Sequence, residues 1–285
     1  MRFYGCRTLY TALQLKLFGQ KPGARTKLLP AESLHRNCHC LSGSEPWRTM
    51  EAIEVKLSNP RLRETGKNYA LRVLKENIVE LELVPGSQVS ENELSAALNL
   101  SRTPIREALS ELEAIKLVEI VPQKKTSISL IDYDMVDEAR FMRYALENAV
   151  IGMVCEERSE EDLLRLEQNL EMQRLFYRNG ALTEFKKKDD EFHRTFFEIT
   201  HKMEVYHLMQ KLQVHFDRVR KLSLSIVPHE SIIEDHEMIV GCIRNQDIPQ
   251  ARSQLKTHLE RYQIDASMIQ TAYPQYFKPN QTQEG

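Results

Sequence analysis

The spacing of apolar residues changes once along the chain, near residue 132. Between residues 66 and 112, apolar side chains recur every three or four positions in three short runs, which predicts three helices. Residues 117–121 and 126–131 then alternate apolar and polar positions, which predicts a β-hairpin. From residue 134 to residue 272 the spacing is helical throughout, so we expect a second domain made of helices.

The second and third helices of the first domain are predicted to be joined by a tight turn. Ser90 and Glu93 have the spacing of a capping box, which starts a helix. Pro104 suits the first turn of the next helix, where its missing N–H is not needed. Three polar residues lie near the amino end of that helix and outside its apolar face: Arg102, Thr103 and Arg106. This arrangement is typical of a helix-turn-helix, whose second helix reads bases with its amino-terminal residues.

A hairpin after three helices makes the predicted first domain a winged helix-turn-helix. The hairpin carries Lys124 and Lys125 at its tip, where lysines suit phosphate contacts. Residues 66–131 hold eight basic and nine acidic residues, so DNA binding depends on where the charges lie. A salt bridge on an exposed face, in the surroundings of Glu107, Ser110 and Glu113, would explain Arg106 alone. Four basic residues on the DNA-facing segments favour DNA binding.

The helical part of the chain predicts an antiparallel bundle. Its expected helices cover residues 134–156, 159–179, 181–200, 203–225, 230–245 and 248–272. The predicted fold is therefore mostly α, with an N-terminal winged helix-turn-helix followed by an all-α six-helix bundle. The expected divisions are an extension over 1–49, an arm over 50–65, the DNA-binding domain over 66–131, the helical domain over 134–273 and a tail over 274–285.

Charge separates the first 49 residues from the rest of the chain. They hold eight basic and two acidic residues, a net charge of +6, whereas the whole chain carries −2. They also lack sustained periodicity, so we expect a disordered or non-native extension, with Met50 as the natural start. His35, Cys38, His39 and Cys40 lie here, but their spacing matches no common zinc framework and has no second half.

Cysteine usage and hydropathy indicate a cytoplasmic protein without a membrane span. Five cysteines are scattered along the chain and form no disulfide framework, which fits a reducing compartment. No apolar run approaches the roughly 18 residues that a membrane-spanning helix needs.

One group of residues in the helical domain suggests metal chemistry. Asp189 and His193 are four positions apart and so share a helix face, and later helices carry His236 and His258. Three imidazoles and one carboxylate suit zinc, nickel, iron(II) or manganese better than calcium. By residue type alone, four other histidines have an equal claim: His201, His207, His215 and His229.

These motifs match a known family. The segments PGSQVSENELSAALNL (85–100) and SRTPIREAL (101–109) closely resemble the DNA-binding signature of GntR-family bacterial regulators. The helical domain resembles the FCD effector domain of the FadR/VanR branch, and six helices suggest the VanR-like type. The matching pieces are the Arg140–Glu147 segment, Asp189 with His193, the Asp235–Ile239 segment, and His258. The resemblance covers roughly residues 66–272.

The resemblance implies a set of roles. Asp189, His193, His236 and His258 would hold a divalent metal, and a small carboxylate or sugar-acid effector would bind beside it. The protein would be a homodimer on palindromic operator DNA, contacted by Arg102, Thr103, Arg106, Lys124 and Lys125, and repression is the default of the family. Four arginines could bind an effector carboxylate bidentately, although a surface salt bridge is an equal alternative for each: Arg140, Arg143, Arg218 and Arg220.

The sequence thus predicts a ligand-responsive transcriptional regulator and no enzyme. The main alternative is a metal-dependent enzyme in the bundle, with Glu191 or Glu234 as a general base. A DNA-bending protein is a third possibility, but the placement of Arg102 and Arg106 favours sequence-specific reading.

Overall fold

The computed structural model describes residues 55–121, 125–224, 226 and 230–279, with the side chains of 262–265 left out. The expected extension over 1–49, the start at Met50 and the wing residue Lys124 lie outside this range. No helix in the described part of the chain is both long enough and apolar enough to span a membrane.

The first domain contains the expected three helices and a sheet of three short strands. Its elements are α2 (Gly66–Val79), β1 (Gln88–Val89), α3 (Glu91–Leu98), α4 (Arg102–Ala114), β2 (Val118–Val121) and β3 (Lys125–Ile128). The strands are antiparallel in the order β1-β3-β2. The hairpin β2–β3 was predicted, but β1 was not, because two residues are too few to show an alternation.

Local chemistry explains the helix-turn-helix. Ser90 and Glu93 form both hydrogen bonds of the capping box at the start of α3. Asn99 ends α3 in the left-handed region, with φ of 52°, a conformation that asparagine tolerates better than most residues. Below the turn, Leu94, Ile105 and Leu112 are fully buried in a core that unites α2, α3 and α4.

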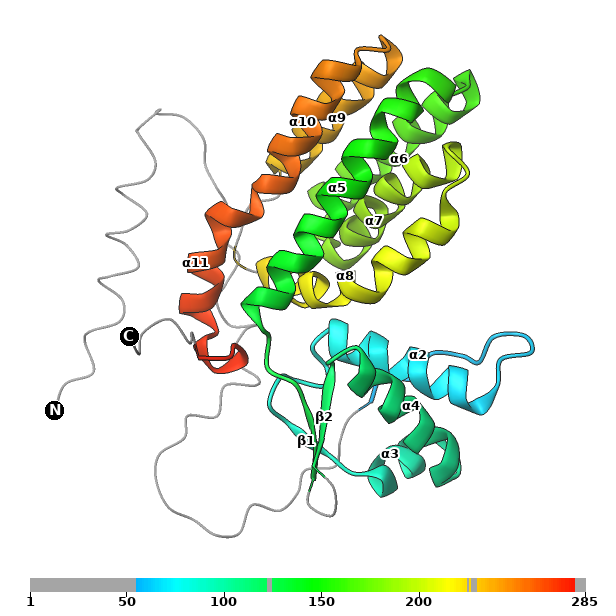
Figure 1. The fold of residues 1–285 in the computed structure, drawn as a ribbon, viewed down its shortest axis with the longest axis vertical. Coiled ribbons are helices and arrows are strands. Elements are labelled where there is room, and N and C mark those ends of the chain that lie inside the picture. Colours follow the sequence, from blue (N-terminus) through cyan, green and yellow to red (C-terminus); the bar gives the residue numbers. More distant parts are fainter. Residues whose placement is uncertain (1–54, 122–124, 225, 227–229, 280–285) are drawn as a thin grey trace, which may run out of the picture. The chain divides into compact units, whose positions relative to one another are not determined.

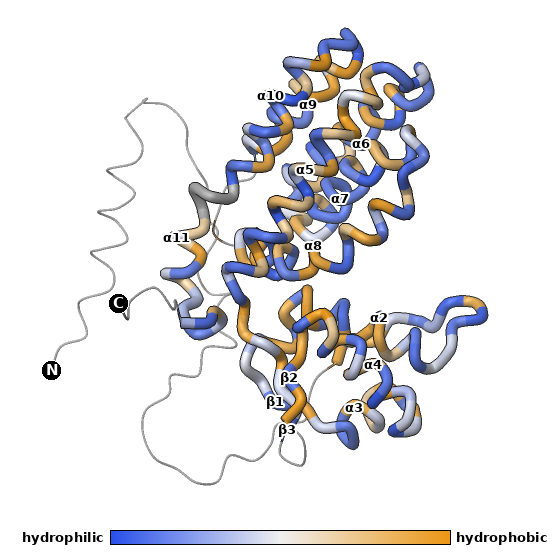
Figure 2. The backbone as a smooth tube through the Cα atoms, in the orientation of Figure 1, coloured by the Kyte–Doolittle hydropathy of each residue, from blue (hydrophilic) through white to orange (hydrophobic). Residues whose placement is uncertain are grey.

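The second domain is the expected helical bundle (Figure 1). It comprises α5 (Tyr133–Glu157), α6 (Glu160–Arg178), α7 (Leu182–Ile199), α8 (Met203–Ser223), α9 (Glu230–Arg244) and α10 (Ile248–Glu260). Figure 2 shows hydrophobic and hydrophilic positions alternating along these helices, as expected where each buries one face.

The end of the chain differs from the sequence-based expectation. The helix expected over 248–272 is two helices, α10 and α11 (Tyr262–Ala272), separated at Arg261. In the described residues the second domain therefore has seven helices, α5 to α11, and not the six expected. The Arg261 side chain forms an ion pair with Asp235 of α9, and no glycine or proline marks the break. After α11, the expected tail begins with a short 3₁₀ helix, η2 (Pro274–Tyr276), and Phe277 is buried.

Candidate metal centre and DNA-binding surface

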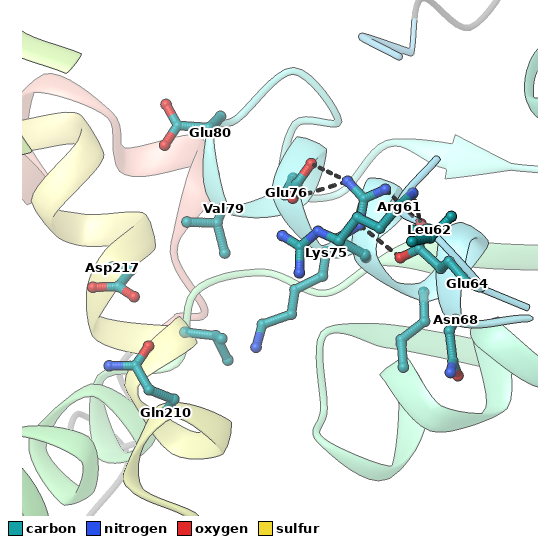
Figure 3. A pocket seen from close by; sticks show the side chains of 13 residues that line it. Arg61, Leu62, Glu64, Asn68, Lys75, Glu76, Val79, Glu80, Gln210 and Asp217 are labelled. Carbon is teal, nitrogen blue, oxygen red and sulfur yellow. Dashed lines mark hydrogen bonds and ion pairs between the residues drawn. The ribbon is translucent and has the colours of Figure 1, made fainter. Parts of the chain in front are cut away.

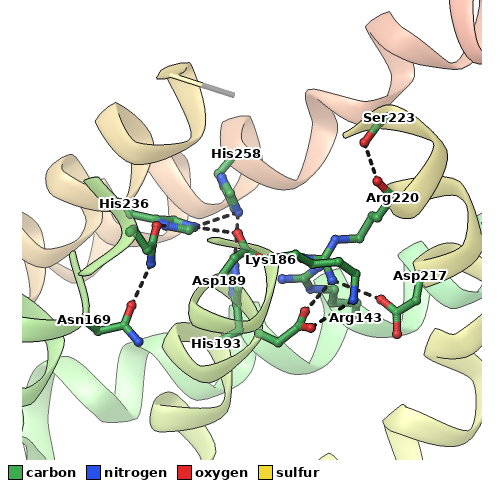
Figure 4. A network of polar contacts seen from close by, with 12 residues as sticks. Arg143, Asn169, Lys186, Asp189, His193, Asp217, Arg220, Ser223, His236 and His258 are labelled. Atoms are coloured by element: carbon green, nitrogen blue, oxygen red, sulfur yellow. Dashed lines mark hydrogen bonds and ion pairs between the residues drawn. The ribbon is translucent and has the colours of Figure 1, made fainter. Parts of the chain in front are cut away.

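Three helices bring the four candidate metal ligands into one buried cluster (Figure 4). Asp189 and His193 lie one turn apart on α7, His236 lies on α9, and His258 lies on α10. One ligand atom from each residue lies within 4.8 Å of the others, and all four side chains are buried. The spacing of Asp189 and His193 was visible in the sequence, but only the fold brings His236 and His258 to them.

The histidines face each other through their Nε2 atoms. The Nε2 atoms of His193 and His258 are 3.1 Å apart, and those of His236 and His258 are 3.2 Å apart. Oδ1 of Asp189 lies 3.5 Å from Nε2 of His236. Three ring nitrogens and a carboxylate oxygen therefore converge on one small volume.

Each imidazole has an oxygen near its other nitrogen. Nδ1 of His193 donates to Oε2 of Glu147 at 2.7 Å, and Nδ1 of His236 donates to Oε1 of Gln173 at 2.9 Å. Nδ1 of His258 lies 3.5 Å from Oδ2 of Asp235. Because a neutral imidazole carries one proton, a proton held on Nδ1 leaves a lone pair on Nε2.

Burial keeps two of these imidazoles neutral. Loss of solvation, reinforced by the Arg143 charge, lowers the pKa of His193. Loss of solvation, reinforced by His258, lowers the pKa of His236 well below its usual value. Neutral imidazole is the form that binds metals.

Arg220 holds the carboxylate of Asp189 in its charged form. The guanidinium donates to Oδ2 of Asp189, which leaves Oδ1 facing the histidines. Burial favours the protonated acid, but Arg220, with His193 beside it, keeps the pKa of Asp189 below its usual range. The same guanidinium contacts Asp190 at 2.5 Å and Asp217 at 3.0 Å.

The cluster fits a divalent cation. Lone pairs on ring nitrogens about 3 Å apart repel each other unless a proton or a cation lies between them. Glu147 and Gln173 hold the protons of His193 and His236 on Nδ1, so the Nε2 lone pairs of both rings face the cluster. Three imidazole nitrogens and one carboxylate oxygen are a donor set typical of zinc, nickel, iron or manganese.

A small hollow lies beside the cluster and contains two of the four candidate effector arginines. Arg143 and Arg220 line it together with Asp190, His193 and Tyr206, and its volume is about 10 Å³. Such a volume is close to that of one water probe.

The other two candidate arginines do not line this hollow. Arg140 forms an ion pair with Asp137 of its own helix at 2.9 Å. Arg218 is fully buried and donates to the backbone oxygen of Ser129 at 2.5 Å, and loss of solvation lowers its pKa to about 10.

The sequence assigned no role to the residues that orient the histidines. Glu147 belongs to the FCD-like segment, and its spacing of four from Arg143 signals a salt bridge, which forms at 2.7 Å. Gln173 lies on α6, a helix without a ligand, and nothing in its sequence neighbourhood marks it. Asp235 could have been noticed only as the neighbour of His236.

The structure also separates the competing histidines. His207 is exposed on α8, and His201 is exposed in the turn before that helix. His215 is buried, and its Nε2 contacts the backbone oxygen of Ile115 at 2.9 Å. His229 lies outside the described residues.

The candidate DNA-binding residues lie on an exposed surface of the first domain. Arg102, Thr103, Arg106 and Lys125 are all exposed. Arg106 has a side chain that is 71% exposed, and it makes two hydrogen bonds to Glu91 of α3, at 3.0 and 2.9 Å. Arg106 therefore forms a salt bridge, but its partner is Glu91 of α3 and not a residue of its own helix.

A larger, open hollow lies between α2 and α8 (Figure 3). Its volume is about 710 Å³, and it is lined by both acidic and basic side chains, among them Arg61, Lys75 and Asp217. It contains none of the four candidate metal ligands, and Arg72 in its wall is already paired with Glu64 at 2.8 Å.

The two glutamates considered as catalytic bases point away from the cluster. Glu191 and Glu234 are exposed. Glu191 forms an ion pair with Lys188 of its own helix at 2.5 Å. Neither carboxylate is placed to activate a water at the histidines.

Comparison with known families divides the chain as its fold does. Residues 70–128 match the family described as bacterial regulatory proteins, gntR family. Residues 138–261 match the FCD domain.

Individual relatives agree with these matches. The HTH-type transcriptional repressor RspR of Escherichia coli strain K12 is 30% identical over 226 residues, which cover 79% of this chain and 98% of RspR. An HTH-type transcriptional regulator of Streptomyces ambofaciens is 31% identical and covers 72% of this chain and 86% of its own length. The solved structure of E. coli McbR/YncC shares the fold, with a TM-score of 0.63 and 18% identity over 74% of this chain and 99% of that one.

Proposed function

Because this chain belongs to the GntR family of bacterial transcription regulators and carries an FCD domain, we propose that it is a repressor controlled by a small organic acid bound at a divalent metal. The family and its relatives are DNA-binding regulators and not enzymes. The proposal places the protein in the cytoplasm, as a homodimer on palindromic operator DNA.

The DNA-binding part of the proposal rests on α4. Arg102, Thr103 and Arg106 lie exposed at its amino end, the part of a recognition helix that contacts base edges. Lys125, and Lys124 beside it in the sequence, would contact phosphates from the wing. In a dimer, two such helices would meet half-sites about one DNA turn, roughly 34 Å, apart.

The charges around the histidines support an anionic effector that requires the metal. Arg143, Lys186 and Arg220 provide three positive charges, and the acidic side chains are Glu147, Asp189, Asp190 and Asp217. With neutral imidazoles the group carries a net charge of −1, which repels an acid. A divalent ion would supply a Lewis-acidic centre and make the net charge of the group positive. Arg143 and Arg220 could then pair with an effector carboxylate.

The observation that carries the metal proposal is the convergence of four buried donor atoms within 4.8 Å. The experiment is metal analysis of protein purified without a chelator or a histidine tag. We expect about one divalent ion per chain, and its loss from the His193→Ala and His236→Ala variants. His207→Ala is the matched control, because His207 is exposed on α8.

An ion content that stays the same in His193→Ala and His236→Ala would overturn the metal proposal. Purified protein without a metal that also fails to bind added Zn²⁺ would do the same. The DNA-binding proposal would survive either result and is tested separately through Arg106.

A further inference from the structure

We propose that residues 273–279, here called the C-terminal strap, tie the interdomain linker to the helical bundle and thereby control the DNA-binding domain. The linker is the segment 129–132, between the end of β3 and the start of α5. The strap lies beyond residue 261, where the FCD match ends, so the family match assigns it no role.

Backbone hydrogen bonds join the strap to the linker. Ile131 forms a parallel bridge with Phe277. The N–H of Ile131 donates to the oxygen of Tyr276, and the N–H of Lys278 donates to the oxygen of Ile131, both at 2.8 Å. Both backbone groups of Ile131, its N–H and its C=O, are therefore bonded to the strap.

Side chains strengthen the same contact. The rings of Phe277 and Tyr133 stack with centroids 4.9 Å apart and an interplanar angle of 12°. Nζ of Lys278 lies 3.1 Å from Oδ2 of Asp132. Ile131 and Phe277 are almost completely buried in a core with Val136 of α5 and other bundle residues.

The strap follows α11 and α10, and α10 carries one of the four candidate ligands. His258 lies in the last turn of α10, and α11 follows after Arg261. Arg261 pairs with Asp235, and Asp235 lies beside Nδ1 of His258. A change in the position of α10 can therefore reach the strap within one short helix.

On its other side, the linker continues into the wing. The N–H of Ser129 donates to the oxygen of Leu117 at 3.0 Å, next to the start of β2. The buried guanidinium of Arg218, on α8, donates to the oxygen of Ser129. The first residue of the linker is thus bonded to the DNA-binding domain, and the middle of the linker is bonded to the strap.

The regulatory part of this inference rests on the proposed function, but the contact itself does not. An allosteric role requires that one element have two states which both sites influence. The strap is that element. When it is bonded to the linker, it fixes the linker in place. When it is detached from the linker, the DNA-binding domain is less constrained. A dimer must present two recognition helices at a fixed spacing, so release changes operator affinity.

The experiment compares Phe277→Ala with Gln275→Ala, because Gln275 is an exposed residue of the same strap. Hydrogen exchange at the amides of the linker measures the contact. Affinity for DNA selected from a random pool by the wild-type protein, with and without Zn²⁺, measures the consequence. For Phe277→Ala we expect linker exchange at least about 10-fold faster and an operator affinity changed by roughly 5- to 150-fold. Gln275→Ala should match the wild type.

A second pair of variants tests the strap without a cavity in the core. Lys278→Pro removes the N–H that donates to Ile131, whereas Lys278→Ala removes only the ion pair with Asp132. We expect Lys278→Pro to behave like Phe277→Ala, and Lys278→Ala to stay closer to the wild type. This pair decides the question if Phe277→Ala does not fold.

The strap proposal is overturned if linker exchange stays at the wild-type rate in Phe277→Ala and Lys278→Pro. Faster exchange with wild-type operator affinity overturns its regulatory role. If the operator affinity of the wild-type protein is the same with and without Zn²⁺, that result counts against the proposed function instead. The strap would then be judged from the affinities measured without zinc.

Discussion

At the scale of single residues, the candidate metal site consists of ligands and the groups that orient them. The ligand types and the spacing of Asp189 and His193 were readable in the sequence. Gln173 was not, because its role depends on α6 packing beside α9, and no local pattern encodes that contact. Its carbonyl oxygen accepts from His236, and its amide donates to Asn169 at 2.7 Å, which fixes the direction of the side chain.

Gln173→Leu should weaken metal binding without removing a ligand. The leucine cannot accept the Nδ1 proton of His236, so the ring loses the contact that directs its Nε2 lone pair to the cluster. We expect a loss of roughly 10- to 100-fold in zinc affinity, the usual effect of removing a partner of a metal-bound histidine. Competition with a chromophoric chelator measures the affinity.

Two further variants serve as controls for the zinc affinity of Gln173→Leu. Gln168→Leu makes the same change at an exposed position of α6 and should keep wild-type affinity. Gln173→Glu restores an acceptor oxygen and should recover part of the loss. Equal zinc affinity in Gln173→Leu and Gln168→Leu would refute the orienting role.

At the scale of elements, the bundle helices and the β2–β3 hairpin were predicted well, but the two-residue strand β1 was not. Every bundle helix up to α9 ends within about two residues of its expected bounds, since each has an apolar face and several have caps such as Ser159 with Asp162. The break between α10 and α11 escaped prediction because the apolar spacing continues through it. Arg261 keeps helical backbone dihedrals at the break, and its side chain pairs with Asp235, a residue far away in the sequence.

The position of Arg106 on the recognition helix α4 leads to a prediction about operator binding. Arg106→Ala should cost about 1–3 kcal/mol of operator binding and relax the choice of base, because a base-reading guanidinium is lost. Electrophoretic or fluorescence titration against the selected operator, and against variants with single base changes, measures both effects.

Glu91 supplies the matched control for this experiment. Its carboxylate accepts two hydrogen bonds from the Arg106 guanidinium. Glu91→Ala removes the partner and keeps the arginine, so it should not weaken operator binding. If Arg106→Ala binds the operator as tightly as the wild type, α4 does not read DNA through this residue.

At the scale of the whole molecule, buried histidines connect stability to pH. Burial lowers the pKa of three histidines from 6.5: His193, His215 and His236. Well above pH 6.5 they are neutral in both the folded and the unfolded chain. Below it, the unfolded chain takes up protons more readily, so the free energy of unfolding decreases as the pH falls.

We therefore expect the urea midpoint of chelator-treated protein to fall between about pH 7 and about pH 5. His215→Gln should make the fall shallower, because one of the three groups is removed. His207→Gln should keep the wild-type slope, since His207 is exposed. A midpoint that is constant over this range in the wild type would contradict the prediction.

The positions of the four candidate ligands have a consequence for chain topology. Asp189 and His258 enclose a segment of about 70 residues that contains α8 and α9. An ion held by all four residues is a reversible cross-link that closes this segment into a loop and joins three helices at one point. Metal depletion would then loosen half of the bundle in a single step, and the cell's metal supply would set the protein's lifetime as well as its response to the effector.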